Sequence, residues 1–155
     1  MKPKAIICDV DGVLLDTSRI IKEIHERKLK GDEKWDFFHK YANHPDYAIK
    51  NEDMFNLINF FLENGFYVFL LTARQEKIHS DTISYLWTGD VKLELFKGKA
   101  NLIMRPDDNK MQACDLKEMQ LKELQKDYDI RLAIDDDLQN CKMFEKNGIL
   151  TLRAM

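Results

Sequence analysis

The sequence predicts an α/β fold, a three-layer sandwich in which helices cover both faces of a central parallel sheet. Short apolar runs have the composition of strands buried on both faces, at residues 4–8, 67–71, 102–104, 130–134 and 149–152. The segments between them repeat apolar side chains at helical spacing. Because single strands alternate with helices, a parallel sheet between helical layers is the economical arrangement. The 155 residues suit a single domain, 1–155.

Helices are expected where apolar residues recur every three or four positions, at residues 17–30, 35–41, 52–64, 78–87, 115–128 and 138–147. Gly31 should interrupt the first two of these helices. Residues 18–50 form the longest interval between two strands, and they are too few for a second domain. We therefore expect a small helical lid there at most, with minimal or no cap over the sheet.

Composition argues against several classes of protein. The net charge of −3 does not indicate a nucleic-acid or membrane-surface protein, although local basic clusters could still bind phosphate. No apolar run approaches the ~20 residues of a membrane span, and the N-terminus lacks a signal-peptide pattern. The three cysteines have no metal-ligand spacing and are expected to be reduced thiols. We expect a cytoplasmic protein that requires no protein partner.

Polar side chains follow the predicted strands where each strand ends. Asp9 and Asp11 follow the first strand, Thr72 and Arg74 the second, and an acidic triplet at 135–137 the fourth. The start of a predicted helix adds Lys117. Ligands of an open parallel sheet bind beyond the carboxyl ends of its strands, so these groups should meet in one cleft.

The carboxylates in this cleft predict a magnesium site. Asp9, Asp11, Asp135 and Asp136 cannot all stay ionised together unless a cation offsets their repulsion. Oxygen ligands favour Mg²⁺, and no cluster of His or Cys competes. For Asp137 the favoured interpretation is a cap on the next helix, since acids are common at helix N-termini.

The spacing Asp9-Val10-Asp11-Gly12 predicts a catalytic pair. Residues two apart lie on one face of an extended chain, so both carboxylates can reach one target. One can attack as a nucleophile while the other moves a proton. Gly12 allows the chain to turn sharply afterwards.

The full set of motifs resembles the haloacid dehalogenase (HAD) superfamily. The residues that carry the resemblance are 9–13 after the first strand, Thr72, Lys117, and the pair Asp135-Asp136. The resemblance spans nearly the whole chain in the family's order. It implies a Rossmannoid fold and a phosphatase that uses Mg²⁺.

The resemblance also implies roles for these residues. Asp9 would attack phosphorus and form an aspartyl phosphate, and Asp11 would protonate the leaving oxygen and then activate water. Thr72 and Lys117 would hold the phosphoryl oxygens. The metal ligands would be Asp9, the backbone carbonyl of Asp11, and Asp135, with Asp136 close by. Such chemistry needs positioning and charge neutralisation more than covalent help.

A narrower resemblance points to the 3′-phosphatase domain of phage polynucleotide kinase-phosphatase. It rests on residues 71–74, 103–109 and 132–136. It implies that Arg74 binds the substrate phosphate. We add two further substrate-binding candidates, Arg105 and Gly12. Arg105 is included because an arginine can clamp a phosphate in bidentate fashion. A polynucleotide 3′-phosphate or a nucleotide is the preferred substrate, and another small phosphomonoester is the alternative.

Other interpretations start from the same residues. A receiver-type signalling domain would place its phospho-accepting Asp at the strand that here ends in Thr72. A catalytically silent interaction module would not require the full set of chemical groups. A carbon–halogen hydrolase would need neither Mg²⁺ nor a proton donor at Asp11. The aromatic residues of 35–41 could stack a base, but packing in a core is the favoured interpretation.

Overall fold

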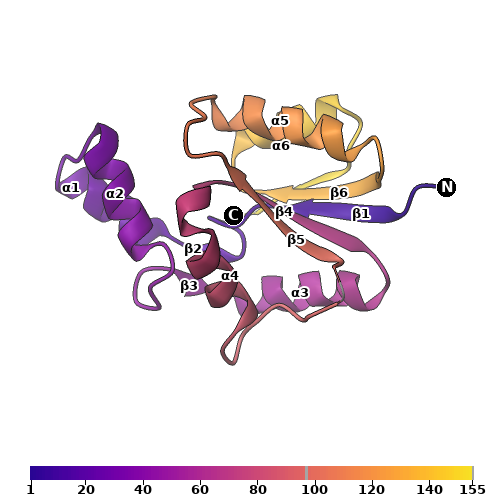
Figure 1. Ribbon diagram of the computed structural model, residues 1–155, viewed down its shortest axis with the longest axis horizontal. Coiled ribbons are helices and arrows are strands. Elements are labelled where there is room, and N and C mark those ends of the chain that lie inside the picture. The colour runs from indigo at the N-terminus through magenta and orange to yellow at the C-terminus, as the bar shows by residue number, and fades with distance from the viewer. Residues whose placement is uncertain (97, 155) are drawn as a thin grey trace.

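Five parallel strands form the central sheet, as the sequence predicts (Figure 1). The computed structural model describes residues 1–96 and 98–154. The strand order is β5-β4-β1-β6-β7, and every neighbouring pair is parallel. The strands are β1 (Lys4–Cys8), β4 (Tyr67–Gln75), β5 (Ala100–Arg105), β6 (Asp129–Asp135) and β7 (Thr151–Arg153).

Helices cover both faces of this sheet (Figure 1). One face carries α3 (Glu52–Glu63), with α4 (His79–Trp87) nearby after a single 3₁₀ turn, Glu76–Ile78. The opposite face carries α5 (Ala113–Leu124) and α6 (Leu138–Lys146). No helix in the described ranges combines the length and apolar character needed to cross a membrane.

The apolar strands alternate between the two layers, because successive side chains of a strand point to opposite faces. In β1, Ile6 and Cys8 pack on the α3 side, whereas Ala5 and Ile7 pack on the α5–α6 side. The register between β1 and β6 shifts at Ala5/Ile6. Both faces of β1 are buried, so its position at the centre of the sheet follows from its composition.

A helical hairpin lies beside the carboxyl edge of the sheet, at the left of Figure 1. It consists of α1 (Ser18–Glu26) and α2 (Gly31–Tyr41), which pack around a small cluster of their own that includes Ile20, Ile24 and Phe38. A two-stranded antiparallel ribbon, β2 (Leu15–Asp16) and β3 (Ile49–Lys50), connects it to the sheet. We call residues 17–48 the lid.

Several boundaries differ from the expectation. The first helix ends at Glu26, short of residue 30, and Gly31 begins the second helix at φ +58° instead of only separating the two. Strand β4 continues to Gln75, because residues after 71 still pair with β5 through Arg105. Helix α5 ends at Leu124, where the chain turns back toward β6. The β2–β3 ribbon was not predicted, since its strands are too short to show periodicity.

Candidate active site

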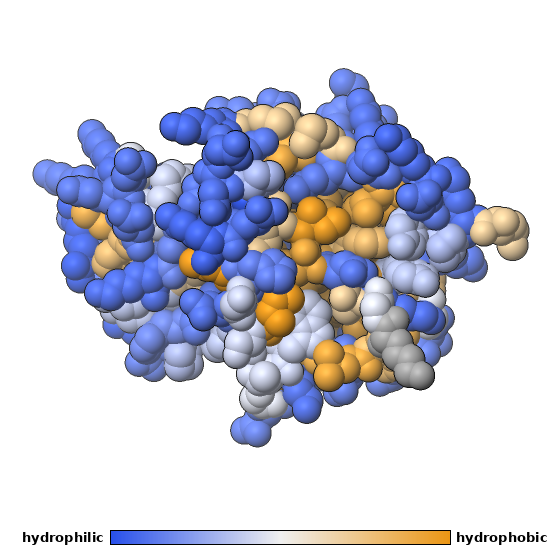
Figure 2. Space-filling model, in the orientation of Figure 1, coloured by the Kyte–Doolittle hydropathy of each residue, from blue (hydrophilic) through white to orange (hydrophobic). Residues whose placement is uncertain are grey.

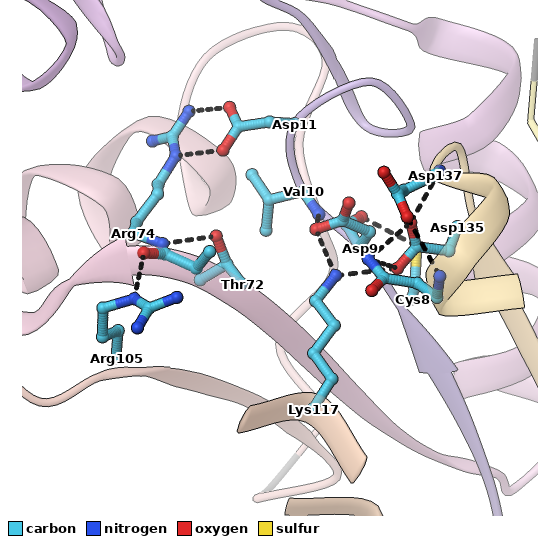
Figure 3. Close-up of polar contacts among 12 residues, drawn as sticks. Cys8, Asp9, Val10, Asp11, Thr72, Arg74, Arg105, Lys117, Asp135 and Asp137 are labelled. Carbon is cyan, nitrogen blue, oxygen red and sulfur yellow. Dashed lines mark hydrogen bonds and ion pairs between the residues drawn. The ribbon is translucent and has the colours of Figure 1, made fainter. Parts of the chain in front are cut away.

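The carboxyl ends of β1, β4 and β6 bring the predicted residues together (Figure 3). Asp9 follows the central strand β1, Thr72 lies within β4, and Asp135 is the last residue of β6. Lys117, in the second turn of α5, reaches the same place from the helical layer. All four side chains are buried, with exposed fractions of 1–8%.

Lys117 bridges two of these carboxylates. Its ammonium nitrogen lies 3.1 Å from Asp9 Oδ1 and 2.7 Å from Asp135 Oδ2. The backbone N–H of Val10 also donates to Asp9 Oδ1, at 2.8 Å. The Asp9 carboxylate is therefore fixed from two sides, with one cation shared between two acids.

Charge in this buried region is only partly balanced. Burial alone would lower the pKa of Lys117, but the carboxylates of Asp9 and Asp135 outweigh it and hold that pKa above its usual value. Burial, together with the Asp135 and Asp11 charges, raises the pKa of Asp9 well above its usual value even though Lys117 opposes the shift. Burial and then Asp135 likewise raise the pKa of Asp136. One lysine thus leaves excess negative charge, which favours an added cation.

Asp9, Asp135 and Asp136 form an acidic cluster. One carboxylate oxygen of each lies within 4.8 Å of the others, and all three donors are the hard oxygens that Mg²⁺ prefers. The side chain of Asp11 is not part of this cluster, so a metal contact from Asp11 would have to come from its backbone carbonyl. The donor set fits the expected ion.

Gly12 makes room for one member of this cluster. Its φ is +83°, and a Cβ built there would lie only 2.0 Å from Asp136 Oδ2. Its N–H donates to the Leu15 carbonyl at 2.8 Å, so it is not available to a substrate. Gly12 has a steric role in this structure, because only glycine lets the Asp136 carboxylate approach the loop, and its role in substrate binding stays a prediction.

Residues of α6 hold Asp135 in place. Asn140 Nδ2 lies 3.2–3.3 Å from both Asp135 oxygens, and the backbone N–H of Asp137 donates to Oδ1 at 3.0 Å. The Asp137 side chain accepts from the Asn140 N–H and caps α6, as predicted. Asn140 was missed because no local pattern distinguishes a buried asparagine from any other helical residue.

Asp11 faces away from Asp9 and toward Arg74 (Figure 3). Arg74 Nε donates to Asp11 Oδ2 at 3.0 Å and Nη2 donates to Oδ1 at 2.7 Å, a bidentate pair. Arg74 is 2% exposed. The two carboxylates of the Asp9-x-Asp11 motif are therefore held by different cations on different sides of the loop.

The remaining donors of Arg74 bind the lid and α4. Nη1 donates to Asn43 Oδ1 at 2.7 Å and to Thr82 Oγ1 at 3.3 Å, and Nη2 donates to the Ala42 carbonyl at 2.9 Å. With the Asp11 pair, all five N–H donors of Arg74 are engaged. In this arrangement Arg74 offers no free donor to a phosphate and instead positions Asp11. Sequence reasoning missed Asn43 and Thr82, since no motif links them to Arg74.

Thr72 and Arg105 complete the predicted set. The Thr72 hydroxyl oxygen accepts a hydrogen bond from the backbone N–H of Arg74 at 3.1 Å and can still donate its own proton. Arg105 donates to the Ala73 carbonyl at 3.3 Å and to the Met111 carbonyl at 2.6 Å, and also contacts Asn109. Arg105 therefore ties β5 to the following loop and is farther from the acidic cluster than Thr72 (Figure 3).

A buried carboxylate beside a lysine, an acidic cluster and a threonine at a sheet's carboxyl edge defines a site suited to phosphoryl chemistry. The family model for HAD superfamily subfamily IIIB (acid phosphatase) matches residues 1–151. The chain belongs to this family of phosphatases, and the HAD expectation is confirmed.

Solved structures share the fold. A chain of the Pnkp1/Rnl/Hen1 RNA repair complex matches 98% of this chain with a TM-score of 0.73 and 21% identity, over 42% of its own length. The class C acid phosphatase from Bacillus anthracis with tungstate bound matches 99% at a TM-score of 0.70 and 16% identity, over 68% of its length. A HAD family enzyme from Bacteroides thetaiotaomicron in a magnesium complex matches 99% at 0.55 and 16% identity, over 93%.

These likenesses concern the fold, because the identities are low. The chain spans less than half the length of the chains it matches in two structures of the Pnkp1/Rnl/Hen1 complex. No curated protein matches the sequence.

Proposed function

We propose that the protein is a Mg²⁺-dependent phosphomonoesterase that works through an aspartyl phosphate on Asp9. The observation that carries the proposal is the Lys117 bridge between Asp9 and Asp135 within a buried acidic cluster. A carboxylate held by Lys117 and the Val10 N–H is fixed in direction, and fixed direction is what in-line attack on phosphorus requires.

The other residues take roles that their contacts support. Lys117 and the Thr72 hydroxyl would hold phosphoryl oxygens beside Asp9. Asp11 would protonate the leaving oxygen and then take a proton from the attacking water. Because Asp11 is paired with Arg74 in this structure, its side chain would turn within the loop toward the reacting oxygen. Arg74 would hold Asp11 between these steps.

Asp9, Asp135 and Asp136, with the Asp11 backbone carbonyl, would hold the Mg²⁺. Bound there, the ion would neutralise charge on the carboxylates and the phosphoryl oxygens. The raised pKa values of Asp9 and Asp136 are consistent with this assignment. Burial is their main cause and the neighbouring carboxylates add to it, and a bound cation would stabilise the ionised form of both groups.

The proposed substrate is a polynucleotide 3′-phosphate or a nucleotide. Two findings support it: the motif resemblance to a polynucleotide 3′-phosphatase, and the shared fold with a chain of an RNA repair complex. We further propose that residues 1–155 act as one domain whose small lid leaves the site open enough for a polymer end.

Substitution of the nucleophile tests the proposal. Asp9→Asn should lower phosphate release by at least about a thousandfold, because an amide cannot attack phosphorus. Release is measured from 4-nitrophenyl phosphate, a 3′-phosphorylated oligonucleotide and free nucleotides, with Mg²⁺ and with a chelator. Rapid quenching and mass measurement should find a phosphoryl group on the wild type alone.

Asp137→Asn is the matched control. It makes the same chemical change two residues from Asp135, and asparagine caps a helix as well as aspartate does. It should retain activity. Near-normal turnover by Asp9→Asn would contradict the aspartyl-phosphate mechanism. Full activity of the wild type in the presence of a chelator would contradict the proposed need for Mg²⁺.

A further inference from the structure

Two adjoining hollows in the lid lie next to Asp11. The first has a volume of about 210 Å³ and is bordered by Asp11 and Arg74 at one end and by Trp35 and Phe38 of α2. The second has a volume of about 370 Å³ and is bordered by residues of α1 and of the α1–α2 turn. The two share Ile21, Ile24 and Lys34, so they adjoin, and the second is the one that Asp11 does not border.

The first hollow lies on the leaving-group side of the proposed reaction. The group that protonates a leaving oxygen must be within hydrogen-bond reach of it. Asp11 is the proposed donor, and it borders this hollow, whereas Asp9 does not. Asp11 would turn from Arg74 toward the leaving oxygen, so the part of the substrate that departs with that oxygen should extend past Asp11 into this hollow.

The walls of the first hollow suit a flat, weakly polar group. Ile21, Ile24, Trp35 and Phe38 supply aliphatic and aromatic surface. Trp35 is 45% exposed although it is the largest side chain of the lid, so the lid's own core does not use its full area. A small apolar area among hydrophilic side chains is visible on the lid at the left of Figure 2. A planar ring could pack on such a surface.

The second hollow is cationic. His25, Lys28, Lys30 and Lys34 border it, together with apolar residues, and no acidic residue does so within the described part of the chain. The acidic residues of α1 face other cations: Glu23 pairs with Arg19 and Arg27, and Glu26 pairs with Lys22. Lysines gathered without a carboxylate favour an anionic ligand.

Lys28 carries a second sign of function. Its φ is +56°, and it is the only non-glycine residue with positive φ in the described ranges. It follows the last turn of α1, a position where glycine is usual because a side chain is strained in the left-handed region. A lysine kept in a strained conformation beside a cationic hollow indicates use of its charge.

We propose that the lid binds a leaving group that carries both a planar ring and a second phosphate, with the ring against Trp35 and the phosphate on Lys28, Lys30 and Lys34. This inference rests on the proposed function and names the part of the substrate that departs. A nucleoside 3′,5′-bisphosphate and the 3′ end of a polynucleotide share this chemistry, because in each the sugar that holds the departing oxygen also carries a base and a 5′-phosphate.

The test removes charge from the second hollow without weakening the fold. Lys28→Gly places glycine at the positive φ, and Lys30→Ser supplies a side-chain cap at the N-cap of α2, where Lys30 makes none. The double variant Lys28→Gly/Lys30→Ser should therefore be at least as stable as the wild type. The control Lys22→Ala/Lys40→Ala removes the same charge from the lid outside both hollows.

The measurement compares cytidine 3′-phosphate with cytidine 3′,5′-bisphosphate. The wild type should prefer the bisphosphate in kcat/KM, and the double variant should lose about fivefold of that preference, the size expected for two exposed ion pairs. The control should keep the preference, and 4-nitrophenyl phosphate, which has no second phosphate, should be hydrolysed equally by all three proteins.

Equilibrium binding of both nucleotides to Asp9→Asn, with and without the double change, separates this inference from the proposed function. If the wild type hydrolyses nothing, the proposed function fails, while weaker bisphosphate binding by the double variant still supports the cationic subsite. Equal affinity for the two nucleotides, or an unchanged preference in the double variant, would overturn it. If a 3′-phosphorylated oligonucleotide is hydrolysed as efficiently as the bisphosphate, the ligand of the lid is a polymer end. If only the bisphosphate is hydrolysed efficiently, the ligand is a free nucleotide.

Discussion

Asp9 and Asp11 are two residues apart, yet they belong to different regions of the molecule. Asp9 is held by Lys117 and by the backbone of its own loop, next to Asp135 at the end of β6. Asp11 is held by Arg74, which also binds Asn43 and the Ala42 carbonyl of the lid. The first set of contacts lies within the sheet and its helices, and the second joins the sheet to the lid.

The difference indicates a division of tasks. Contacts around Asp9 come from elements that share the main core, so the proposed attack on phosphorus would be directed by residues anchored in that core. Contacts around Asp11 come partly from the lid, which has a small core of its own. Proton transfer to the leaving group should therefore depend on the lid, while attack should not.

The largest expected effect lies in the Asp9 region. Lys117→Met should lower the free energy of unfolding by about 3–5 kcal/mol, because two buried carboxylates lose their shared cation. Urea unfolding measures the loss, and Lys122→Met on the exposed side of α5 is the control. The pKa of Lys117 is raised on folding, so its contribution is fully present below its usual pKa of about 10.4 and is lost only at higher pH.

The stability of the Lys117→Met variant should also depend on pH, through the Asp9 carboxyl group. Without Lys117 the Asp9 carboxylate loses the cation that opposes the rise of its pKa, so that pKa should rise further. A raised carboxyl pKa favours the folded state at low pH, so part of the lost stability should return as the pH falls. A loss as small as that of Lys122→Met would show that the Lys117 bridge does not stabilise this region.

A smaller loss is expected at Gly12, where the two regions meet. Gly12→Ala should cost about 1–2 kcal/mol for the left-handed backbone, plus the displacement of Asp136. Gly65→Ala is matched to it, because φ there is +85° and nothing lies near the added methyl group. Urea unfolding and phosphate release should show a greater loss of stability and of activity for Gly12→Ala than for Gly65→Ala. Equal losses would contradict the steric role of Gly12.

The smallest effect should arise from Arg74→Lys, which keeps the charge but loses the fork that orients Asp11. We expect kcat/KM to fall about tenfold for alkyl phosphates, a fraction of what a general acid contributes. The fall should be much smaller for 4-nitrophenyl phosphate, whose leaving group needs no proton. Arg105→Lys should not change the ratio of the two substrates, and a uniform loss in Arg74→Lys would mean that Arg74 acts on the phosphate instead.

The sequence predicted which residues gather around Asp9 but not the contacts that hold Asp11, and the reason is physical. Strands buried on both faces, and the polar residues that end them, follow from local pattern and from the geometry of parallel sheets. Asp9, Thr72 and Asp135 were therefore placed correctly at one edge. The Arg74 contacts join residues 31 and 63 positions apart, through Asn43 and Asp11, and no local pattern carries such information.

The lid shows the same limit. Its helices were predicted from apolar spacing, but the connection through β2 and β3 was not, because two-residue strands have no periodicity. The contact between α6 and Asp135 through Asn140 was also beyond reach, since it depends on how the helix packs. Long-range packing, rather than element type, separates what was predicted from what was not.

The ribbon between the sheet and the lid has a consequence for how this protein can vary. Leu15 pairs with Lys50, so the chain leaves for the lid and returns from it at adjacent positions. A segment inserted between two neighbouring points can be exchanged for another of different length or composition without shifting the strands on either side. Substrate choice could then diversify by replacing this one segment, while the contacts that hold Asp9 stay unchanged in the sheet and its helices.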